Sequence, residues 1–488
     1  MTGLGPRDER SFGVIGLGVM GQNLALNLEE HGVPVVVWNR ASDRPDDFLA
    51  KNAGKRLVCT ETLEELTSVL DRPRRILLMV KAGSPVDDVL DSLLPHLAAG
   101  DVVLDGGNSA FTDTRRRQAA LEARGVALIG IGISGGEAGA RHGPSLMPGG
   151  ERSGYQLVQP VLETIAARSE SGPCVTYVGP NGAGHFVKTV HNGIEYADMQ
   201  LIAESYDLLR NGLDLELERV VEIYSGWNDG LLASYLIELT ATVLAVRDEE
   251  TGRPLIDLVE DQAGQKGTGK WAAEAAMDLG VPVPTISAAI DARLLSNMKK
   301  ERVIASGALR RDGAWAKQLA HGDKLELVPA IRDALLASRI VSYAQGMSLI
   351  VAASREYAWS IDLREIARIW KGGCIIRSRL LDPIMVAFGR RADLANLLLD
   401  EVLGASVVAN EDALRRVVCT AHELRLPVPA LSASLAYLDS YRSARLPQSL
   451  TQAQRDAFGG HGYGRIDHPE RGAVHTDWIP DRGWAVTP

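Results

Sequence analysis

The first third of the chain alternates short apolar runs with segments of helical spacing. The apolar runs are rich in β-branched residues and end at glycine or polar turns. Short buried strands that alternate with helices are typical of βαβ units and a parallel sheet. Strands are predicted at FGVIG, VPVVVW, RRILLMV, DVVLD, VALIGIG and CVTYVG, between Ser11 and about Val178.

Near Gly179 the pattern changes to a helical period. PNGAG precedes a helix predicted from about Ala183 to Arg210, and helical periodicity continues to about residue 445. The apolar run 231–246 contains Glu238 and is shorter than the ~20 residues that span a bilayer, so it is predicted to be a buried helix. From Leu446 onward, prolines and paired glycines predict an extended tail.

These patterns predict three parts. Residues 1–180 form a Rossmann-like α/β domain, residues 181–445 an all-helical domain, and residues 446–488 a C-terminal tail. Within the helical part, MQLIAE and VVEIYSGW are echoed about 147 residues later by MSLIVA and IARIWKGG. The echo predicts a duplicated helical bundle, with chance similarity between amphipathic helices as the alternative.

Composition narrows the class of protein. The chain has 488 residues, 45% hydrophobic and 23% charged, which is typical of a folded globular protein. A net charge of −10 disfavours binding to nucleic acid or an anionic membrane, so neither partner is expected. The four cysteines form no CxxC pair, which indicates neither a disulfide framework nor a zinc site. The polar N-terminus lacks a secretory pattern, and we expect a cytoplasmic protein.

A glycine-rich turn follows the first predicted strand and opens a helix. In that context Gly16, Gly18 and Gly21 of a GxGxxG motif can hold a pyrophosphate, although a tight turn without a ligand is the alternative. The second strand ends in Asn39-Arg40 rather than in the acidic residue that accepts from the ribose of NAD. An arginine in that place favours NADP, unless it is simply a solvated surface residue.

Three further loops follow predicted strands, at the sheet edge where open α/β sheets bind ligands. Each offers free backbone amides, and a hydroxyl with two glycines suits a carboxylate. The loops are Val80-Lys81-Ala82-Gly83, Asp105-Gly-Gly-Asn108-Ser109 and Ser134-Gly135-Gly136-Glu137. Simple turns are the alternative interpretation.

The strongest chemical signal is a polar stripe on the helix that starts near Ala183. Lys188, His191, Asn192, Glu195 and Tyr196 lie at i, i+3, i+4, i+7 and i+8, so they share one face beside a separate apolar stripe. Such a face is expected to line a cleft, although a solvent-exposed helix side is the alternative. A lysine with a lowered pKa and a glutamate two turns away could act as base and acid.

GQKGTGKW resembles a nucleotide P-loop but has Trp271 where that motif needs Ser or Thr, and no strand precedes it. Lys266 and Thr268 among glycines still suit a phosphate group. Arg293 and Arg455 are further candidate phosphate partners, since arginine binds phosphate bidentately.

Several of these motifs together resemble the 6-phosphogluconate dehydrogenase family, in the same order from about residue 12 to 478. The motifs are GLGVMGQNLALN, DGGNS, SGGEAGARHGPSLMPGG, GAGHFVKTVHNGIEYADMQL, DQAGQKGTGKW and QAQRDAFGGH. The resemblance implies a Rossmann-like coenzyme domain, a duplicated all-helical domain, and a tail that reaches the partner subunit of a homodimer. It further implies oxidative decarboxylation of 6-phosphogluconate to ribulose 5-phosphate and CO2, with NADP⁺ reduced, in the pentose phosphate pathway, without a metal.

By resemblance, Lys188 is the general base and Glu195 the general acid. The implied substrate-binding residues are Asn108, Ser134, Gly135, Gly136, His191, Asn192, Tyr196, Lys266, Thr268 and Arg293, with Arg455 and His461 from the partner's tail. The implied coenzyme-binding residues are Gly16, Leu17, Gly18, Val19, Met20, Gly21, Asn39, Arg40, Ala41, Val80, Lys81, Ala82 and Asn108.

The chain departs from the family pattern at three places. Ala41 stands where a threonine is common, which weakens the expected preference for NADP over NAD. Ala272 and Gly462 also replace threonines, but neither removes an assigned catalytic group. Two alternatives stay open: another β-hydroxyacid dehydrogenase, such as one for 3-hydroxyisobutyrate, and a catalytically silent NADP-binding protein.

Overall fold

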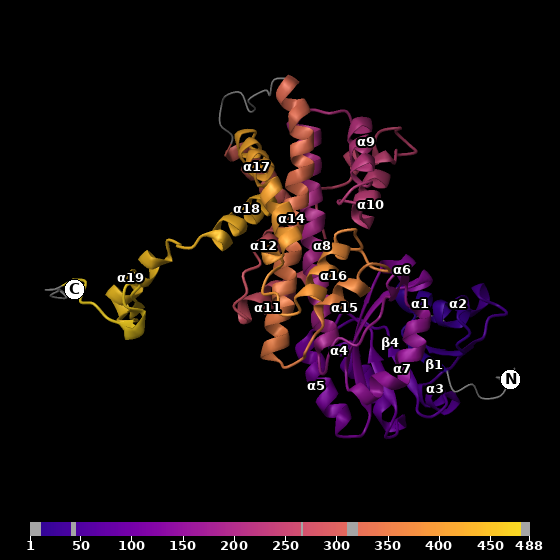
Figure 1. The fold of residues 1–488 in the computed structure, drawn as a ribbon. Coiled ribbons are helices and arrows are strands. Elements are labelled where there is room, and N and C mark those ends of the chain that lie inside the picture. The colour runs from indigo at the N-terminus through magenta and orange to yellow at the C-terminus, as the bar shows by residue number, and fades with distance from the viewer. Residues whose placement is uncertain (1–10, 41–44, 265–266, 310–320, 480–488) are drawn as a thin grey trace. The chain divides into compact units, whose positions relative to one another are not determined.

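The computed structural model describes residues 11–40, 45–264, 267–309 and 321–479. The chain forms two compact units, residues 1–435 and 436–488. Figure 1 shows the course of the chain and the labels of its elements.

The first unit begins with a seven-stranded sheet, in the order β3-β2-β1-β4-β5-β6-β7. All neighbouring strands are parallel except β6 and β7, which are antiparallel. The strands are β1 (Phe12–Ile15), β2 (Val35–Trp38), β3 (Leu57–Cys59), β4 (Arg75–Leu78), β5 (Val102–Asp105), β6 (Ala127–Ser134) and β7 (Ser145–Gly150). The predicted Rossmann-like α/β domain is confirmed.

Five predicted strands correspond to β1, β2, β4, β5 and β6, whereas the prediction for CVTYVG is wrong. That segment runs beside β7 and forms only isolated bridges, Leu146 with Val175 and Gly149 with Gly179. Pro148 in β7 has no N–H to donate, so a regular ladder cannot form there. The short β3 and the Pro- and Gly-containing β7 had no strong strand signal in the sequence.

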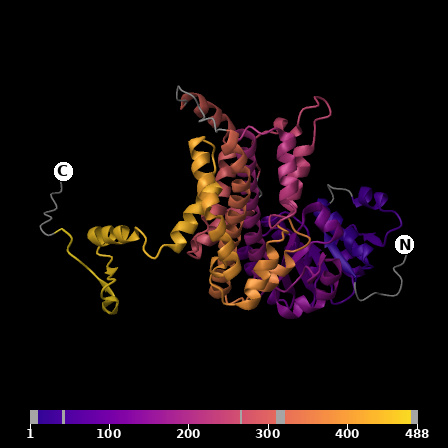
Figure 2. The same cartoon turned by 45° about the horizontal axis from the view of Figure 1, so that its top comes forward.

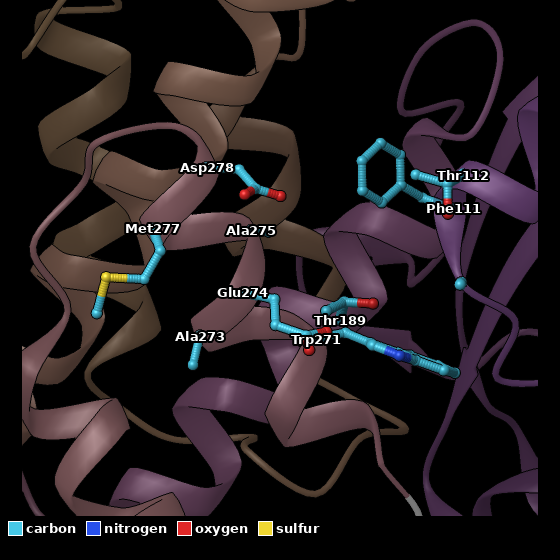
Figure 3. Close-up of a pocket in the computed structure, with 10 residues that line it drawn as sticks. Phe111, Thr112, Thr189, Trp271, Ala273, Glu274, Ala275, Met277 and Asp278 are labelled. Atoms are coloured by element: carbon cyan, nitrogen blue, oxygen red, sulfur yellow. The ribbon is translucent and has the colours of Figure 1, made fainter.

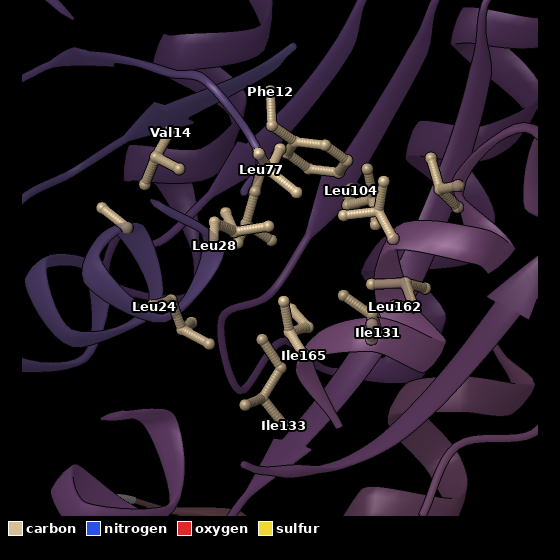
Figure 4. Packing of buried hydrophobic residues seen from close by; sticks show 14 of the residues in the cluster. Phe12, Val14, Leu24, Leu28, Leu77, Leu104, Ile131, Ile133, Leu162 and Ile165 are labelled. Atoms are coloured by element: carbon tan, nitrogen blue, oxygen red, sulfur yellow. The ribbon is translucent and has the colours of Figure 1, made fainter. Parts of the chain in front are cut away.

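Two apolar layers cover the two faces of this sheet. One contains Phe12, Val14, Leu104 and Ile131 with residues of α1 and α7 (Figure 4), and the other contains Ile15 and Ile76 with residues of α3, α4 and α5. Alternation along each strand sends neighbours such as Val14 and Ile15 to opposite faces. The covering helices are α1 (Val19–Glu30), α2 (Pro45–Lys51), α3 (Leu63–Val69), α4 (Ser84–Leu93), α5 (Phe111–Glu122), α6 (Gly136–His142) and α7 (Arg152–Ile165).

Two long helices, α8 (Ala183–Asp207) and α14 (His321–Glu356), run side by side through the helical part (Figures 1 and 2). A fully buried ion pair joins them, with Nη2 of Arg339 3.0 Å from Oδ2 of Asp198. The other helices of this part are α9 (Leu217–Trp227), α10 (Tyr235–Ala245), α11 (Thr268–Asp278), α12 (Pro284–Ser296), α13 (Lys299–Ala308), α15 (Leu363–Ile369), α16 (Leu381–Arg390) and α17 (Glu401–Glu423). The helix α18 (Pro429–Arg442) begins in the first unit and ends in the second. The large all-helical domain is confirmed.

Among the described residues, Glu326–Glu356 of α14 is long and apolar enough to cross a bilayer, but 83% of its most apolar stretch is buried in the protein. It is a core helix of this fold. The echoed sequences lie on α8 and α14 and then on α9 and α15, in the same order.

Two sequence predictions need correction. The run 231–246 becomes α10, but Leu239, Val243 and Val246 are exposed, so the helix is only half-buried. The tail is not wholly extended, because the second unit contains α19 (Gln448–Gly459) and the short strands β10 (Tyr463–Gly464) and β11 (Ala473–Val474). Pro447 directly precedes α19, a place where proline is compatible with a helix.

Glycines bring α8 directly onto the sheet. A Cβ on Gly184 would lie 2.1 Å from the carbonyl oxygen of Gly130, and one on Gly132 would lie 2.5 Å from Cβ of Lys188. No side chain larger than hydrogen fits at either contact. The first turns of α8 therefore lie against the carboxyl end of β6, where Ser134 ends the strand.

Candidate active site

The polar face of α8 is buried rather than solvent-facing. The exposed fractions are 7% for Lys188, 0% for His191, 6% for Asn192 and 6% for Tyr196, and the Glu195 side chain is 20% exposed. This excludes the alternative of a solvated helix side. Buried charged and polar side chains need partners, so the contacts of this face define what it can do.

His191 lies at the centre of these contacts. Its Nδ1 is 3.4 Å from Nζ of Lys188, 3.3 Å from Oδ1 of Asn192 and 3.7 Å from Oε2 of Glu195. Its Nε2 is 3.1 Å from Oγ of Ser134, on the adjacent strand β6. The structure thus brings together the predicted base, the predicted acid and the predicted carboxylate-binding serine.

Burial sets the protonation of these groups. It lowers the pKa of the Lys188 amine below its usual range, and the Glu195 charge opposes this only in part. It raises the pKa of the Glu195 carboxyl, against the charges of Lys188 and Arg293. Burial and then the Lys188 charge hold the pKa of His191 well below its usual value. A lysine that loses its proton easily and a glutamate that keeps one are suited to act as base and acid.

One wall of the site comes from a segment that the sequence analysis did not assign. The ring of Trp370, fully buried, meets His191 edge to face at a centroid distance of 5.4 Å. A Cβ on Gly135 would lie only 2.5 Å from the carbonyl oxygen of Gly373, so only glycine fits there. The only sequence signal for this wall was its echo of the segment at Val220. The Ser134-Gly135-Gly136 turn therefore packs directly on Gly373, and Trp370 packs on His191.

The residues predicted to hold phosphate gather around Tyr196. The Arg293 guanidinium lies 3.5 Å from the centre of the Tyr196 ring, and a Cβ on Gly269 would meet that ring at 2.5 Å. Thr268 is buried and begins α11. Lys266 lies outside the described residues. Thus α11 brings Gly269, the neighbour of Thr268, against the Tyr196 ring, and α12 brings Arg293 against it.

The three glycines of the GxGxxG motif differ in surroundings, as a dinucleotide turn requires. A Cβ on Gly16 or Gly21 would meet backbone oxygens at 2.5 and 1.9 Å, whereas one on Gly18 would meet no atom of the described residues within 4 Å. Gly18 is exposed and precedes α1. The first and third glycines allow the strand and helix to pack, and the second leaves the backbone open to a pyrophosphate. The turn fits a dinucleotide.

A cavity of about 220 Å³ adjoins this turn. Its lining includes Gly16, Gly18, Asn39, Arg40, Val80 and Lys81. The amide of Leu17 donates to Oδ1 of Asn39 at 3.2 Å, which connects the turn to the end of β2. Val19 and Met20 begin α1, and Ala82 lies half-buried in the next loop. Ala41 lies outside the described residues.

Asn108 projects from the 105–109 loop that follows β5, and it is exposed. The buried Asp105 shapes this loop by accepting from the amide of Gly107 at 3.1 Å and from Oγ of Ser109 at 2.7 Å. A second cavity, of about 660 Å³, lies beside it (Figure 3). It is lined by Ala110, Phe111 and Thr112 of one wall, Thr189 of α8, and α11 residues from Trp271 to Asp278. Neither Lys188 nor Glu195 lines it.

Arg455 and His461 belong to the second unit. Arg455 lies on α19, and His461 follows the end of that helix. Asp456, fully buried, accepts from the amide of Gly462 at 2.8 Å and from Nδ1 of His475 at 2.9 Å. The segment that carries both predicted tail residues is therefore held in a defined shape. Their contribution to a partner's site stays a prediction.

Comparison with known proteins identifies the family. The model of the NAD binding domain of 6-phosphogluconate dehydrogenase matches residues 11–179, and that of the 6-phosphogluconate dehydrogenase C-terminal domain matches residues 184–478. The chain is 51% identical over 476 residues to "6-phosphogluconate dehydrogenase, decarboxylating" of Synechocystis, covering 96% of this chain and 98% of that protein. It is 50% identical over 471 residues to the NADP(+)-dependent, decarboxylating enzyme of Bacillus subtilis, covering 96% and 99%.

A solved structure agrees with these sequence comparisons. The 6-phosphogluconate dehydrogenase of Plasmodium falciparum, described in its apo form and in complexes with NADP+ and with 6-phosphogluconate, superposes with a TM-score of 0.92 at 42% identity. The match covers 96% of this chain and 100% of that one. With domains, motifs and fold all in agreement over nearly the whole length, the chain belongs to the 6-phosphogluconate dehydrogenase family.

Proposed function

We propose that this chain oxidises and decarboxylates 6-phosphogluconate to ribulose 5-phosphate and CO2 while NADP⁺ is reduced, acting as a homodimer in the cytoplasm. The observation that carries the proposal is the buried α8 face, on which Lys188 and Glu195 both have pKa values shifted toward their neutral forms. The named relatives support the substrate and the coenzyme.

The GxGxxG turn and the neighbouring 80–83 loop bind the coenzyme in this proposal. The open backbone at Gly18 and the positive end of α1 would hold the pyrophosphate, and Arg40 would face the 2′-phosphate. When bound, NADP⁺ accepts a hydride from C3 of the substrate.

Lys188 supplies the base for that oxidation. Its neutral amine takes the proton of the C3 hydroxyl, and the product is a 3-keto acid. The buried, neutral ring of His191 lies 3.4 Å from the amine and can accept a hydrogen bond from the ammonium that forms. Water is largely excluded, because Lys188 is only 7% exposed. Exclusion of water strengthens these electrostatic contacts.

Decarboxylation follows from the chemistry of the keto acid. The ketone is β to the carboxylate, so it accepts the electron pair as CO2 leaves, and an enediol remains. Ser134 and the amides of Gly135 and Gly136 would orient the carboxylate before it departs. Glu195, whose raised pKa keeps a proton available, then protonates C1 of the enediol, which is the former C2 of the substrate. Tyr196, Thr268 and Arg293 would hold the phosphate, together with Arg455 and His461 of the partner's tail.

The experiment that tests this function is the absorbance of the reduced coenzyme at 340 nm. We expect turnover with 6-phosphogluconate and NADP⁺, and slower turnover with NAD⁺. Turnover with 3-hydroxyisobutyrate instead would favour another β-hydroxyacid dehydrogenase, and coenzyme binding without any turnover would favour a silent binding protein.

A further inference from the structure

Arg117 of α5 is a buried charge that the mechanism above does not use. Its side chain is 2% exposed, and it lies beneath the two loops that the coenzyme and the substrate would both approach. The 80–83 loop carries Val80, Lys81 and Ala82, and the 105–109 loop carries Asn108. Burying a guanidinium is costly unless every N–H finds a partner, so the partners of Arg117 are informative.

On one side, Arg117 holds the 80–83 loop and the helix that follows it. Nη2 donates to the carbonyl oxygen of Gly83 at 2.9 Å. Nε and Nη2 donate to the two carboxylate oxygens of Asp87 in the first turn of α4, both at 2.9 Å. This fork holds the pKa of Asp87 down at about 2, so the carboxylate stays charged.

On the other side, Arg117 reaches the 105–109 loop. Nη1 lies 3.4 Å from Oγ of Ser109 and 3.5 Å from Oδ2 of Asp105, the residue that shapes the loop around Asn108. The loops also touch directly, since a Cβ on Gly107 would lie 3.0 Å from the carbonyl oxygen of Val80. One guanidinium therefore connects both loops, and neither can shift without straining its hydrogen bonds.

We propose that Arg117 is a positioning residue that couples the 80–83 loop to the 105–109 loop, so that the affinities for coenzyme and substrate depend on it together. The proposal rests on the proposed function for the identity of the two ligands. Arg117 itself is buried and is not among the residues predicted to contact either ligand.

The test uses Arg117→Met with a matched control on the same helix. Arg116 also donates to both oxygens of Asp87, at 2.9 and 3.0 Å, but it is 59% exposed, and its charged partners among the described residues are Asp87 and Asp113. Arg116→Met therefore removes the same charge and a contact to the same carboxylate without freeing either loop.

Binding is measured separately for NADPH, by its fluorescence, and for 6-phosphogluconate, by calorimetry. We expect Arg117→Met to weaken both by about tenfold, the typical loss for hydrogen bonds to a charged group, and Arg117→Lys to recover part of both. Arg116→Met should change neither. Loss of one affinity alone, or equal losses in both variants, would overturn the proposal.

A milder variant tests the same point if Arg117→Met does not fold. Asp87→Asn weakens the contact that holds the 80–83 loop, whose residues are predicted to bind the coenzyme only. Coupling predicts that this variant weakens both ligands, whereas independent loops predict a loss of NADPH affinity alone. Amide hydrogen exchange without ligands separates this inference from the proposed function. Faster exchange in both loops of Arg117→Met supports the coupling even if 6-phosphogluconate is not the substrate, and unchanged exchange contradicts it.

Discussion

The helices α8 and α14 are both long, buried and central, yet they use buried polar groups differently. With Met199 aligned to Met347, as the sequence echo suggests, the places of Lys188 and Glu195 on α8 are taken by Leu336 and Tyr343 on α14. The buried charge of α14, Arg339, is fully paired with Asp198 and also donates to the carbonyl oxygen of Leu232 at 3.1 Å. Among the residues that the structure describes, Lys188 has no such ion pair, and its pKa is lowered. A paired buried charge stabilises the packing of helices, whereas an unpaired titratable one is available for chemistry.

Lys188→Met should have the largest effect on activity. Loss of a general base costs about 10²–10⁴-fold in rate, and the methionine fits the apolar stem of the lysine. We expect turnover at 340 nm to fall by at least that factor, with NADPH affinity unchanged. Near-normal turnover would show that Lys188 is not the base. The proposed difference between α8 and α14 in how they use buried charges would then be wrong.

Arg339→Met should act on stability instead. It leaves Asp198 buried without its partner, which costs about 3–5 kcal/mol. Denaturant unfolding measures this loss, and the folded fraction should keep its KM for both substrates. If the variant were as stable as the wild type but inactive, then Arg339 would belong to the site and the two helices would not differ as described.

Glu204, at the far end of α8, is expected to make stability depend on pH. It is 2% exposed, and burial raises its pKa to about 7, although the amides of Leu431 and Ala430 lower it in part. Between the ordinary value of 4.5 and about 7 the folded state binds the extra proton, so the free energy of unfolding falls as pH rises through this window.

The raised pKa of Glu204 sets an upper limit of about 3 kcal/mol on the change in the free energy of unfolding across this pH window. Glu204→Gln should therefore flatten this part of the stability profile relative to the wild type. Parallel profiles for the two proteins would show that Glu204 titrates normally.

The smallest effect concerns the pH dependence of the rate. The charge of Glu195 raises the pKa of Lys188 against the effect of burial, so Glu195→Gln should lower it further. Glu195→Gln also removes the proposed general acid, so the rate itself should fall. In the activity that remains, the rising limb of kcat/KM, which follows deprotonation of Lys188, should move to lower pH. A limb that stays in place would mean that the two groups do not interact.

The sequence was most informative where the spacing of residues within a single helix or turn was enough for a prediction. The spacing of Lys188, His191 and Glu195 predicted their common face, and the glycine turn predicted the coenzyme cradle. Contacts between distant segments had no such signal. The contacts of Trp370 with His191 and of Arg117 with the two loops depend on how helices pack on the sheet. In the sequence, the arginines of TRRRQ cannot be told apart from exposed surface arginines. The segment 174–179 has a strand-like composition but forms only isolated bridges to β7, because Pro148 has no N–H to donate.

The claim that the polar face of α8 catalyses both the oxidation and the decarboxylation is tested most directly by comparing the two products of the reaction. Wild-type protein is incubated with 6-phosphogluconate and NADP⁺, and NADPH and released CO2 are counted together. The buried lysine and glutamate predict equal amounts of both from the wild type and neither from Lys188→Met. NADPH without CO2, or CO2 from the lysine variant, would contradict this assignment.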